Sequence, residues 1–542
     1  MIIRFKTGIM KKPLLLLLLS LIGMKASFSQ TADDPAWKSI DSLVHAYMDK
    51  GKIPGLSIVI VKDGSSFFRT YGYRDLAAKA PVTPLTLFEL GSCSKAFTGL
   101  AALQMMREHR LDPDAAVSDY LPWFKARYKG APVKITISQL LHHTSGIPWK
   151  TISTIPQRQD ANALEQTVRN VSHLSLHHRP GEQYEYATVN YDIVALVIQQ
   201  LAGRPFESWL QDSIIHRVGL AHTSVGVPSD GRQMALGYKT GFFAPRLYHA
   251  PVFRGNYAAG YVISNAVDMG TWLRVQLGAG DSTMNVLTGL SHQRDESVAP
   301  AGLYSYAIGW QVSLSGNGEI VHTGENPNFT SYIAFRKARN IGVAVLANSN
   351  SSYTPFIGDW IMKRLTGDVL RNDVNPDSGN DKIFSGVSIV LGVFLVTALV
   401  CLVLLLSAIF HRRRHWAPPP RTKRWSLLFL TVFLAGVGYA IYLLPQIIGF
   451  SWEAMCVWSP VSFITMVRLL AGGIAAGYLL YVLSMFFPGD ENKKKEGAVI
   501  VGVCTIVGLS NMALILLVTS SFHETGIPIR YQKVRLRRNA AD

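Results

Sequence analysis

Hydrophobic and polar positions predict regular structure at the start of the region 30–370. Apolar residues recur at helical spacing through 36–50, which predicts a helix. The next run has the composition of two strands and reads GLSIVIVKDGSSFFRTYGYRD. Asp63-Gly64 separates the two strands, and this residue pair is typical of a tight hairpin turn. The sequence therefore predicts a helix followed by a β-hairpin.

The end of the same region again has the pattern of strands. Three β-rich runs, EIVHTG, SYIAFRK and IGVAVLAN, lie between 319 and 348, and IGDWIMKRLTG then predicts a helix. Residues 135–230 have mostly helical or irregular patterns. Strands at both ends with helices between them favour an α/β (α+β) fold. We expect one antiparallel sheet built from both ends, flanked by helices, with a helical subdomain beside it.

The chain beyond Lys382 is dominated by long apolar runs. The first is uncharged, covers 383–410 and is long enough to cross a hydrocarbon core of about 30 Å. Three further runs follow, at 425–449, 461–487 and 497–522. The sequence therefore predicts four transmembrane helices, preceded by a polar linker at 371–382 and followed by a basic tail at 523–542.

The two ends of the chain indicate a membrane orientation. Residues 1–29 combine basic residues, a short apolar run and then small residues, which is typical of a secretory signal peptide. An uncleaved anchor is the alternative. The loop HRRRHWAPPPRTKR carries six Lys and Arg, which favours the cytoplasmic side. We therefore expect a multi-pass protein of the cytoplasmic membrane with its large domain outside, on the periplasmic side. Four spans leave the basic tail outside as well, against the same rule, so its side stays open.

Charge and cysteine content exclude several classes of partner. The net charge is +17, but residues 30–382 carry 33 Lys and Arg against 30 Asp and Glu, so the excess flanks membrane segments. We expect membrane lipid as a partner and no nucleic acid.

Cys93 is the one cysteine of the predicted soluble region, so no disulfide closes within it. His142 and His143 lack acidic or cysteine companions, so we expect no metal and no cofactor. The oligomeric state is not determined by the sequence.

The stretch FELGSCSKAFTG contains three neighbouring candidate nucleophiles. Ser92 precedes a helical pattern and lies three residues before Lys95, so the two side chains share a helix face. A serine hydroxyl is a weak nucleophile that needs a base, and a desolvated lysine can serve as one. Cys93 and Ser94 point elsewhere on the helix. The pattern predicts that Ser92 attacks and Lys95 takes its proton, although an N-cap serine beside a solvated lysine is the alternative.

Longer segments extend this motif in a fixed order. There are five such segments, in this order along the chain: LFELGSCSKAFTGLAALQMM, ITISQLLHHTSGIP, PGEQYEYATVNYDIVALVIQQLAG, GNYAAGYVISNAVDMGTWLRVQL and EIVHTGENPNFTSYIAFRKARNIGVAVLAN. Together they resemble the class C β-lactamase and D-Ala-D-Ala carboxypeptidase family, serine hydrolases of the penicillin-recognising fold. The resemblance covers about 36–367.

The resemblance implies roles for further residues. Tyr186, in YAT, would relay protons to the leaving group and help to activate water, and His322, in HTG, would replace a lysine that is commoner there. The backbone N–H groups of Ser92 and Glu325 would form the oxyanion hole. The remaining positions expected to bind substrate are Thr323, Gly324 and Thr188.

Two departures from the family pattern affect the expected substrate. Thr188 stands where the family usually has asparagine and offers one hydroxyl in place of an amide donor and acceptor. His322 is neutral near pH 7 unless it is perturbed, so it would hold a substrate carboxylate less strongly than lysine does. D-Ala-D-Ala-type peptides, D-amino-acid peptides, β-lactams and esters all stay open as substrates.

We expect a membrane-anchored serine hydrolase that works through an acyl-enzyme on one of these amide or ester substrates. The alternative is a catalytically weak protein that senses cell wall or β-lactams and signals through its membrane helices. Transport is disfavoured because Arg468 is almost the only ionisable residue within the apolar runs.

Overall fold

A computed structural model describes residues 35–300, 302–370, 376, 377 and 379–489. The predicted signal peptide, the fourth apolar run at 497–522 and the basic tail lie outside the described residues, as does part of the predicted linker. The boundaries that we assign to domains therefore stay predictions.

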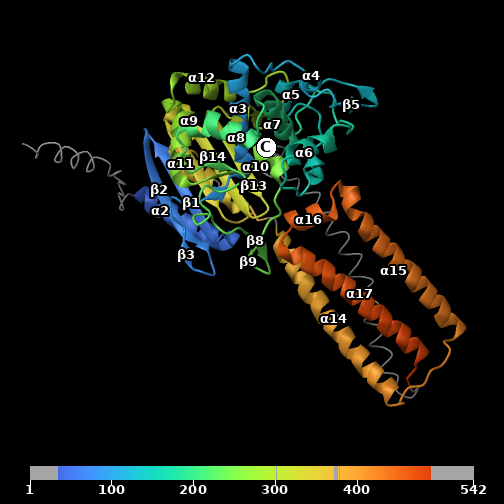
Figure 1. Ribbon diagram of the computed structural model, residues 1–542. Helices are drawn as coiled ribbons and strands as arrows, with labels where there is room; N and C mark the ends of the chain where they lie inside the picture. The colour runs from blue at the N-terminus through green and yellow to red at the C-terminus, as the bar shows by residue number, and fades with distance from the viewer. Residues whose placement is uncertain (1–34, 301, 371–375, 378, 490–542) are drawn as a thin grey trace, which may run out of the picture. The chain divides into compact units, whose positions relative to one another are not determined.

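An eight-stranded antiparallel sheet joins the two ends of the hydrolase-like region (Figure 1). β1 pairs with β15, with Leu56 opposite Ala347, so strands almost 300 positions apart in the chain lie side by side. This confirms the predicted sheet. In spatial order the strands are β11 (Tyr304–Tyr306), β12 (Gln311–Ser313), β13 (Glu319–Asn326), β14 (Phe329–Arg336), β15 (Ile341–Ala347), β1 (Gly55–Lys62), β2 (Ser65–Asp75) and β3 (Ala80–Pro81).

The hairpin between β1 and β2 has the predicted turn. Asp63 and Gly64 both have positive φ, at 50° and 80°, and both strands continue in register to Lys62 opposite Ser65. Two consecutive left-handed residues are what a two-residue hairpin loop requires, because their twist matches that of the strands.

Helices cover both faces of the sheet. The ring of Tyr332 on β14 lies against Gly358 of α13, where a side chain on Gly358 would overlap it. The neighbouring Ser331 points to the opposite face, where its hydroxyl donates to the carbonyl of Leu90 at 2.6 Å. Because both faces are covered, β14, β15 and most of β1 are buried along their length. The sheet is thus the middle of three layers.

The helices of this region include one before β1 and one after β15, and the others lie in the chain between the strands at the two ends, as predicted. They are α2 (Pro35–Gly51), α3 (Lys95–Arg107), α4 (Val117–Tyr120), α5 (Ile137–Leu141), α6 (Ala163–Val171), α7 (Val189–Ala202), α8 (Phe206–Leu210), α9 (His216–Val218), α10 (Tyr257–Gly260), α11 (Ala266–Arg274), α12 (Ser282–Ser291) and α13 (Tyr353–Thr366).

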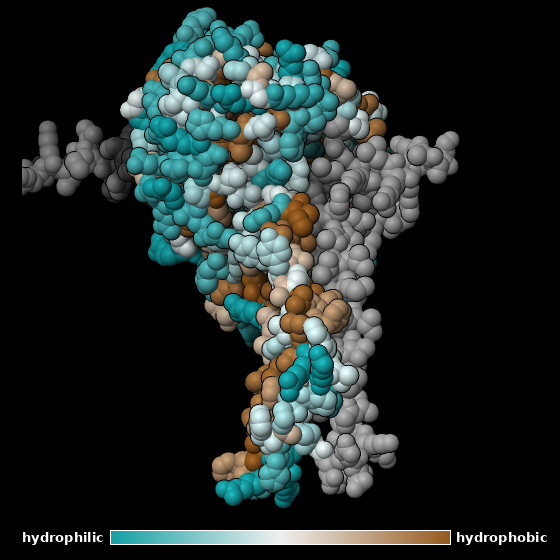
Figure 2. Space-filling view, turned by 90° about the vertical axis from the view of Figure 1, so that its right-hand side faces the viewer, coloured by the Kyte–Doolittle hydropathy of each residue, from teal (hydrophilic) through white to brown (hydrophobic). Residues whose placement is uncertain are grey.

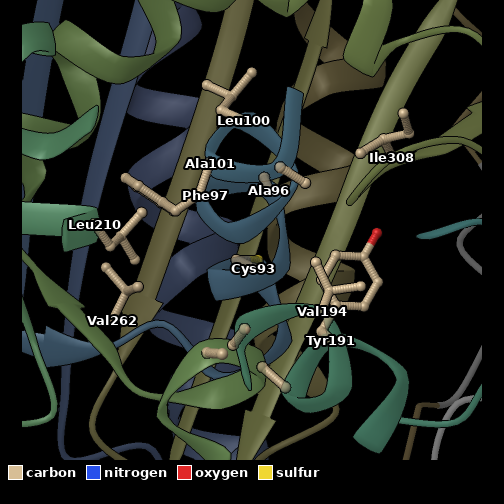
Figure 3. Packing of buried hydrophobic residues seen from close by; sticks show 14 of the residues in the cluster. Cys93, Ala96, Phe97, Leu100, Ala101, Tyr191, Val194, Leu210, Val262 and Ile308 are labelled. Atoms are coloured by element: carbon tan, nitrogen blue, oxygen red, sulfur yellow. The ribbon is translucent and has the colours of Figure 1, made fainter. Parts of the chain in front are cut away.

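α3 lies at the centre of the hydrophobic core. Most of its residues are buried on every side, including Phe97, whose ring stacks on Trp272 at 3.9 Å between ring centroids. Tyr191 and Val194 of α7 approach it from one side and Ile308 from another (Figure 3). A helix enclosed in this way is held rigidly, so the residues at its start have fixed positions.

Short strands complete the region, and one pair leads into the start of α3. β4 (Phe88–Glu89) pairs with β10 (Val262–Ser264), which also pairs with β7 (Ser224–Val225). The other short pairs are β5 (Arg127–Tyr128) with β6 (Ala131–Pro132) and β8 (Tyr238–Gly241) with β9 (Ala244–Leu247).

Three of the helices beyond residue 379 are long and apolar enough to cross a membrane, among the residues that the structure describes. They are α14 (Asn380–Phe410), α15 (Arg421–Ile448) and α17 (Val461–Phe486), and a short helix α16 (Trp452–Trp458) precedes the last. α14 begins inside the predicted linker. Large apolar side chains are exposed on α14 and α15, and Figure 2 shows them as brown surface. Such surface is typical of helices that face lipid.

Candidate functional site

The turn that precedes α3 separates the three candidate nucleophiles. Gly91–Ser94 form a 3₁₀ turn, η1, directly before Lys95. The thiol of Cys93 is buried and donates to the carbonyl of His322 at 3.3 Å, and burial raises its pKa to about 12. The hydroxyl of Ser94 is buried and accepts from the backbone N–H of Val262 at 2.9 Å. Ser92 is half-buried and is the one of the three that contacts Lys95.

Lys95 lies between Ser92 and a backbone carbonyl. Its Nζ is 2.9 Å from Ser92 Oγ and 2.9 Å from the carbonyl oxygen of Ala259. The side chain is fully buried. Burial lowers the pKa of Lys95 to about 7, and the nearby carboxyl of Asp192 opposes this shift only in part. At neutral pH a substantial share of Lys95 is therefore the free amine, which can accept a proton.

Tyr186 lies over the lysine. Lys95 Nζ is 5.0 Å from the centroid of the Tyr186 ring. The Tyr186 hydroxyl is buried, and its interaction with Ser92 falls short of ordinary hydrogen-bond geometry. Burial raises the pKa of Tyr186 well above its usual value, so the phenol stays protonated and able to donate. The structure thus brings three of the predicted residues, Ser92, Lys95 and Tyr186, to one place.

His322 joins this group from β13, and both of its ring nitrogens have partners. Nδ1 lies 2.6 Å from the carbonyl oxygen of Thr323, which can only accept, so Nδ1 carries the proton. Nε2 then accepts from the hydroxyl of Tyr306 at 2.9 Å. Burial and the positive charge of Lys95 lower the pKa of His322 to about 3. The ring is therefore neutral near pH 7.

β13 is an interior strand of the sheet, although its far end extends past one neighbour. β12 pairs with it at Val321 and Ile320, and β11 lies beyond β12. The register to β12 ends at Val321, whereas the register to β14 continues to Asn326.

The backbone of β13 fits closely against the turn that holds Ser92. Gly91 has φ of +52°, and a side chain there would lie 2.5 Å from the backbone nitrogen of Glu325. A side chain on Gly324 would overlap the carbonyl oxygen of Leu90. The two glycines allow the backbones of β13 and η1 to meet. The predicted oxyanion donors, the N–H groups of Ser92 and Glu325, therefore come from backbone segments that touch.

Thr188 is the N-cap residue before α7 and is buried, and its carbonyl accepts from the N–H of Tyr191 at 3.2 Å. Asn190 does not replace the missing family asparagine, because its amide is committed elsewhere. Its Oδ1 accepts from Ser145 and its Nδ2 donates to Nδ1 of His143, both at 3.0 Å. Asn190 is thus a buried residue of α7.

His143 is a site residue that sequence reasoning missed, since we considered it only as a possible metal ligand. Its ring packs against the ring of Tyr186 with centroids 4.2 Å apart. Its carbonyl accepts from the N–H of Glu185 and its Nδ1 from the N–H of Ala187, so it holds the backbone on both sides of Tyr186. His142, in contrast, bonds the carbonyl of Ser138 on its own helix. The motif HHTSG, which contains His143, was the sequence signal that could have identified this residue.

Tyr306 is the second residue that was missed. It lies on β11, is buried, and contacts Tyr186, His143 and His322. No motif surrounds it in the sequence, and its place in the site depends entirely on the sheet.

The comparisons agree with this geometry. The family model described as Beta-lactamase matches residues 40–368. The chain is 31% identical over 471 residues to Protein flp of Staphylococcus aureus (strain COL), with 83% of this chain and 90% of that protein covered. It is 25% identical to a Beta-lactamase of Escherichia coli (strain K12), with 58% of this chain and 90% of that one covered. The match to Protein flp is too long for the family domain alone, so it includes part of the C-terminal region.

Two solved structures have the same fold. The octameric penicillin-binding protein homologue from Pyrococcus abyssi superimposes with a TM-score of 0.55 at 25% identity, with 66% of this chain and 81% of that chain covered. EstCE1, a hydrolase with promiscuous acyltransferase activity, superimposes with a TM-score of 0.53 at 21% identity, with 60% and 97% covered. The chain therefore belongs to the beta-lactamase family, and residues 40–368 have the serine-hydrolase fold of that family.

Proposed function

We propose that this protein is a membrane-anchored serine hydrolase that acts outside the cytoplasm through a Ser-Lys-Tyr acyl-enzyme. The observation that carries the proposal is the 2.9 Å contact between Ser92 Oγ and the Nζ of a fully buried Lys95. A serine beside a lysine whose pKa is lowered to about 7 has the base that it needs.

Acylation follows from this pair. Ser92 Oγ attacks the substrate carbonyl carbon while its proton passes to the free amine of Lys95. The carbonyl oxygen becomes negative, and the N–H groups of Ser92 and Glu325 stabilise it. Losing one such donor typically costs about 10²–10³ in rate. The leaving group departs with a proton, which Tyr186 relays from Lys95, and an ester on Ser92 remains.

Deacylation uses the same groups in reverse. A water molecule attacks the ester, its proton passes through Tyr186 and Lys95, and Ser92 regains its own proton as the acid leaves. Tyr186 suits a relay because burial keeps its phenol protonated and its ring lies against Lys95. His143 supports this step by holding the backbone on both sides of Tyr186.

The state of His322 favours substrates without a carboxylate beside the scissile bond. The ring is neutral, and its two nitrogens already bond Thr323 and Tyr306. It therefore lacks both the charge and the free donor that would bind a carboxylate. This supports uncharged esters or amides as better substrates than peptides that end in D-Ala-D-Ala.

The anchoring part of the proposal rests on the three apolar helices and on the loop 411–424. The six basic residues of the loop favour the cytoplasmic side, which supports a position outside the cytoplasm for the domain before α14.

Labelling of the purified full chain tests the proposal. The protein is incubated with fluorescent penicillin and, separately, with an activated p-nitrophenyl ester, and the adduct mass and the hydrolysis rate are measured. We expect a covalent adduct and turnover in the wild type, and neither in Ser92→Ala. Cys93→Ala is the matched control, because its thiol faces the carbonyl of His322 and the variant should keep both activities.

Two results would count against the proposal. Ester hydrolysis that survives Ser92→Ala would show that another group does the chemistry. An adduct that forms but never turns over would favour the alternative of a sensing protein.

A further inference from the structure

A cavity of about 230 Å³ is lined by Glu89 of β4, whose carboxyl group accepts a hydrogen bond from Asn326. The lining includes Tyr257 and Tyr261. The exposed side chains of Leu247 and Val252 also line it, so it can be reached from solvent. A volume of this size equals about eight water molecules, which is room for a small organic molecule.

Glu89 is an acid without a positive partner in this cavity. Its Oε2 accepts from the amide Nδ2 of Asn326 at 2.6 Å, and it forms no ion pair among the residues that the structure describes. A half-buried carboxylate with one hydrogen bond keeps unused acceptor capacity, since two carboxylate oxygens together accept about four bonds. A cation that enters the cavity would satisfy it.

Aromatic rings stand beside the carboxyl group. The centroids of Tyr257 and Tyr261 are 5.8 Å apart, and the rings are inclined at 48°. The Tyr257 ring lies directly against Gly226, which also lines the cavity and has no side chain to displace it. Ring faces attract cations, and an ammonium group gains most where water is excluded.

We propose that this cavity is a binding site for a small primary ammonium ion, held by the carboxylate of Glu89 beside the rings of Tyr257 and Tyr261. The five-atom n-butylammonium ion is a suitable probe. For a ligand of this size we expect a dissociation constant on the order of 1 mM.

Protonation of Glu89 should compete with the ligand. Burial raises the pKa of Glu89 to about 7, and the bond from Asn326 opposes the shift in part. The other titratable groups that line the cavity are Tyr248, His249, Tyr257 and Tyr261. The tyrosines have raised pKa values and stay neutral, whereas a protonated His249 would repel a cation. An amine of ordinary pKa stays charged over this whole pH range, so the change in affinity comes from ionisation of Glu89. The affinity for the ammonium ion should therefore rise about tenfold from pH 6 to pH 8.

The cavity is connected to the catalytic residues without being part of them. The Nδ2 of Asn326 also donates to the carbonyl of Gly260 at 2.9 Å. Asn326 follows Glu325, and Gly260 follows Ala259, whose carbonyl accepts from Lys95. The site does not depend on the acyl-enzyme mechanism, so Ser92→Ala should bind the ammonium ion as the wild type does.

Calorimetric titration of the full chain in detergent tests the proposal. n-Butylammonium is titrated at pH 6, 7 and 8, and the pH 7 titration is repeated in two buffers that differ in ionisation enthalpy. We expect tighter binding at higher pH and release of about half a proton at pH 7. Propionamide, which has the same number of heavy atoms and no charge, should show neither effect.

Variants assign the effect to Glu89. Glu89→Gln should weaken n-butylammonium binding at pH 8 at least tenfold and remove the pH dependence of binding. His249→Asn should keep most of that pH dependence. Absent binding, pH-independent binding, or unchanged binding by Glu89→Gln would each overturn the proposal. So would loss of binding in Ser92→Ala, which would place the ion at the nucleophile. The proton release uses unaltered protein, so it decides the question even if Glu89→Gln fails to fold.

Discussion

Lys95 Nζ lies 2.9 Å from Ser92 Oγ and at the same distance from the carbonyl oxygen of Ala259. The carbonyl can only accept, so it holds one hydrogen of the lysine and orients the nitrogen toward the serine. Without water around it, the amine loses its charge more easily than an exposed lysine does. One buried contact therefore supplies both the geometry and the basicity that serine chemistry needs.

The pH dependence of hydrolysis should report Lys95. The free amine is the active form, and burial lowers its pKa to about 7, so kcat/KM for an uncharged ester should rise with pH, reach half its maximum near pH 7 and level off above about pH 8. A pH-rate profile with a non-ionising ester measures this. A profile that keeps rising until pH 10 would show an unperturbed lysine.

His143→Ala should slow catalysis more than it weakens substrate binding. The substitution removes the acceptor for the N–H of Ala187 and the ring that packs on Tyr186, so Tyr186 should be misplaced. We expect kcat to fall about 10- to 100-fold with a smaller change in KM. The free energy of unfolding should fall by about 2–4 kcal/mol, because the variant loses a buried side chain that forms hydrogen bonds.

Steady-state kinetics well below the unfolding temperature, together with thermal melts, separate the two effects of His143→Ala. His142→Ala is the matched control, since its ring contacts the carbonyl and the hydroxyl of Ser138 and the variant should leave both quantities unchanged. Equal kinetics for the two variants would contradict a positioning role.

His322→Lys should change the preference for charged substrates. A lysine would bring a positive charge where the present ring is neutral and fully bonded. A hydrogen bond to a charged group is worth about 1.5–3 kcal/mol, so KM for a substrate with a terminal carboxylate should fall about tenfold or more relative to its carboxamide analogue. Kinetics on the paired substrates measure the ratio. An unchanged ratio would show that substrate carboxylates do not reach this position.

Thr188→Asn should favour amide substrates. Asparagine offers both a donor and an acceptor where threonine offers one hydroxyl. One additional hydrogen bond should raise kcat/KM for an amide relative to an ester of the same acid by about two- to tenfold. Thr188→Val is the control, because it keeps the shape and removes the hydroxyl. If Thr188→Asn and Thr188→Val give the same ratio, residue 188 does not contact the scissile group.

Reporter fusions should reveal the topology. Alkaline phosphatase, which is active only outside the cytoplasm, should be inactive after residue 416, in the basic loop. It should be active after residue 542 if all four predicted runs span the membrane. Inactivity there would mean that one run does not cross, and activity at residue 416 would reverse the proposed orientation.

The sequence by itself determined the features that depend on local spacing. Strands and helices at both ends followed from periodicity, and the Asp63-Gly64 turn from the φ values that those residues tolerate. Ser92 and Lys95 share a face because three residues make nearly one helical turn. Long apolar runs needed only their length to indicate the membrane helices.

The tertiary structure alone decided the electrostatics and the partners within the site. Burial lowers the pKa of Lys95, and burial comes from segments more than 150 positions away in the chain, such as the carbonyl of Ala259. Tyr306 reaches His322 only because β11 and β13 belong to one sheet. His143 holds Tyr186 through contacts across more than 40 positions. Local pattern does not encode which distant groups exclude water from a side chain, and that exclusion determines whether the side chain carries a charge.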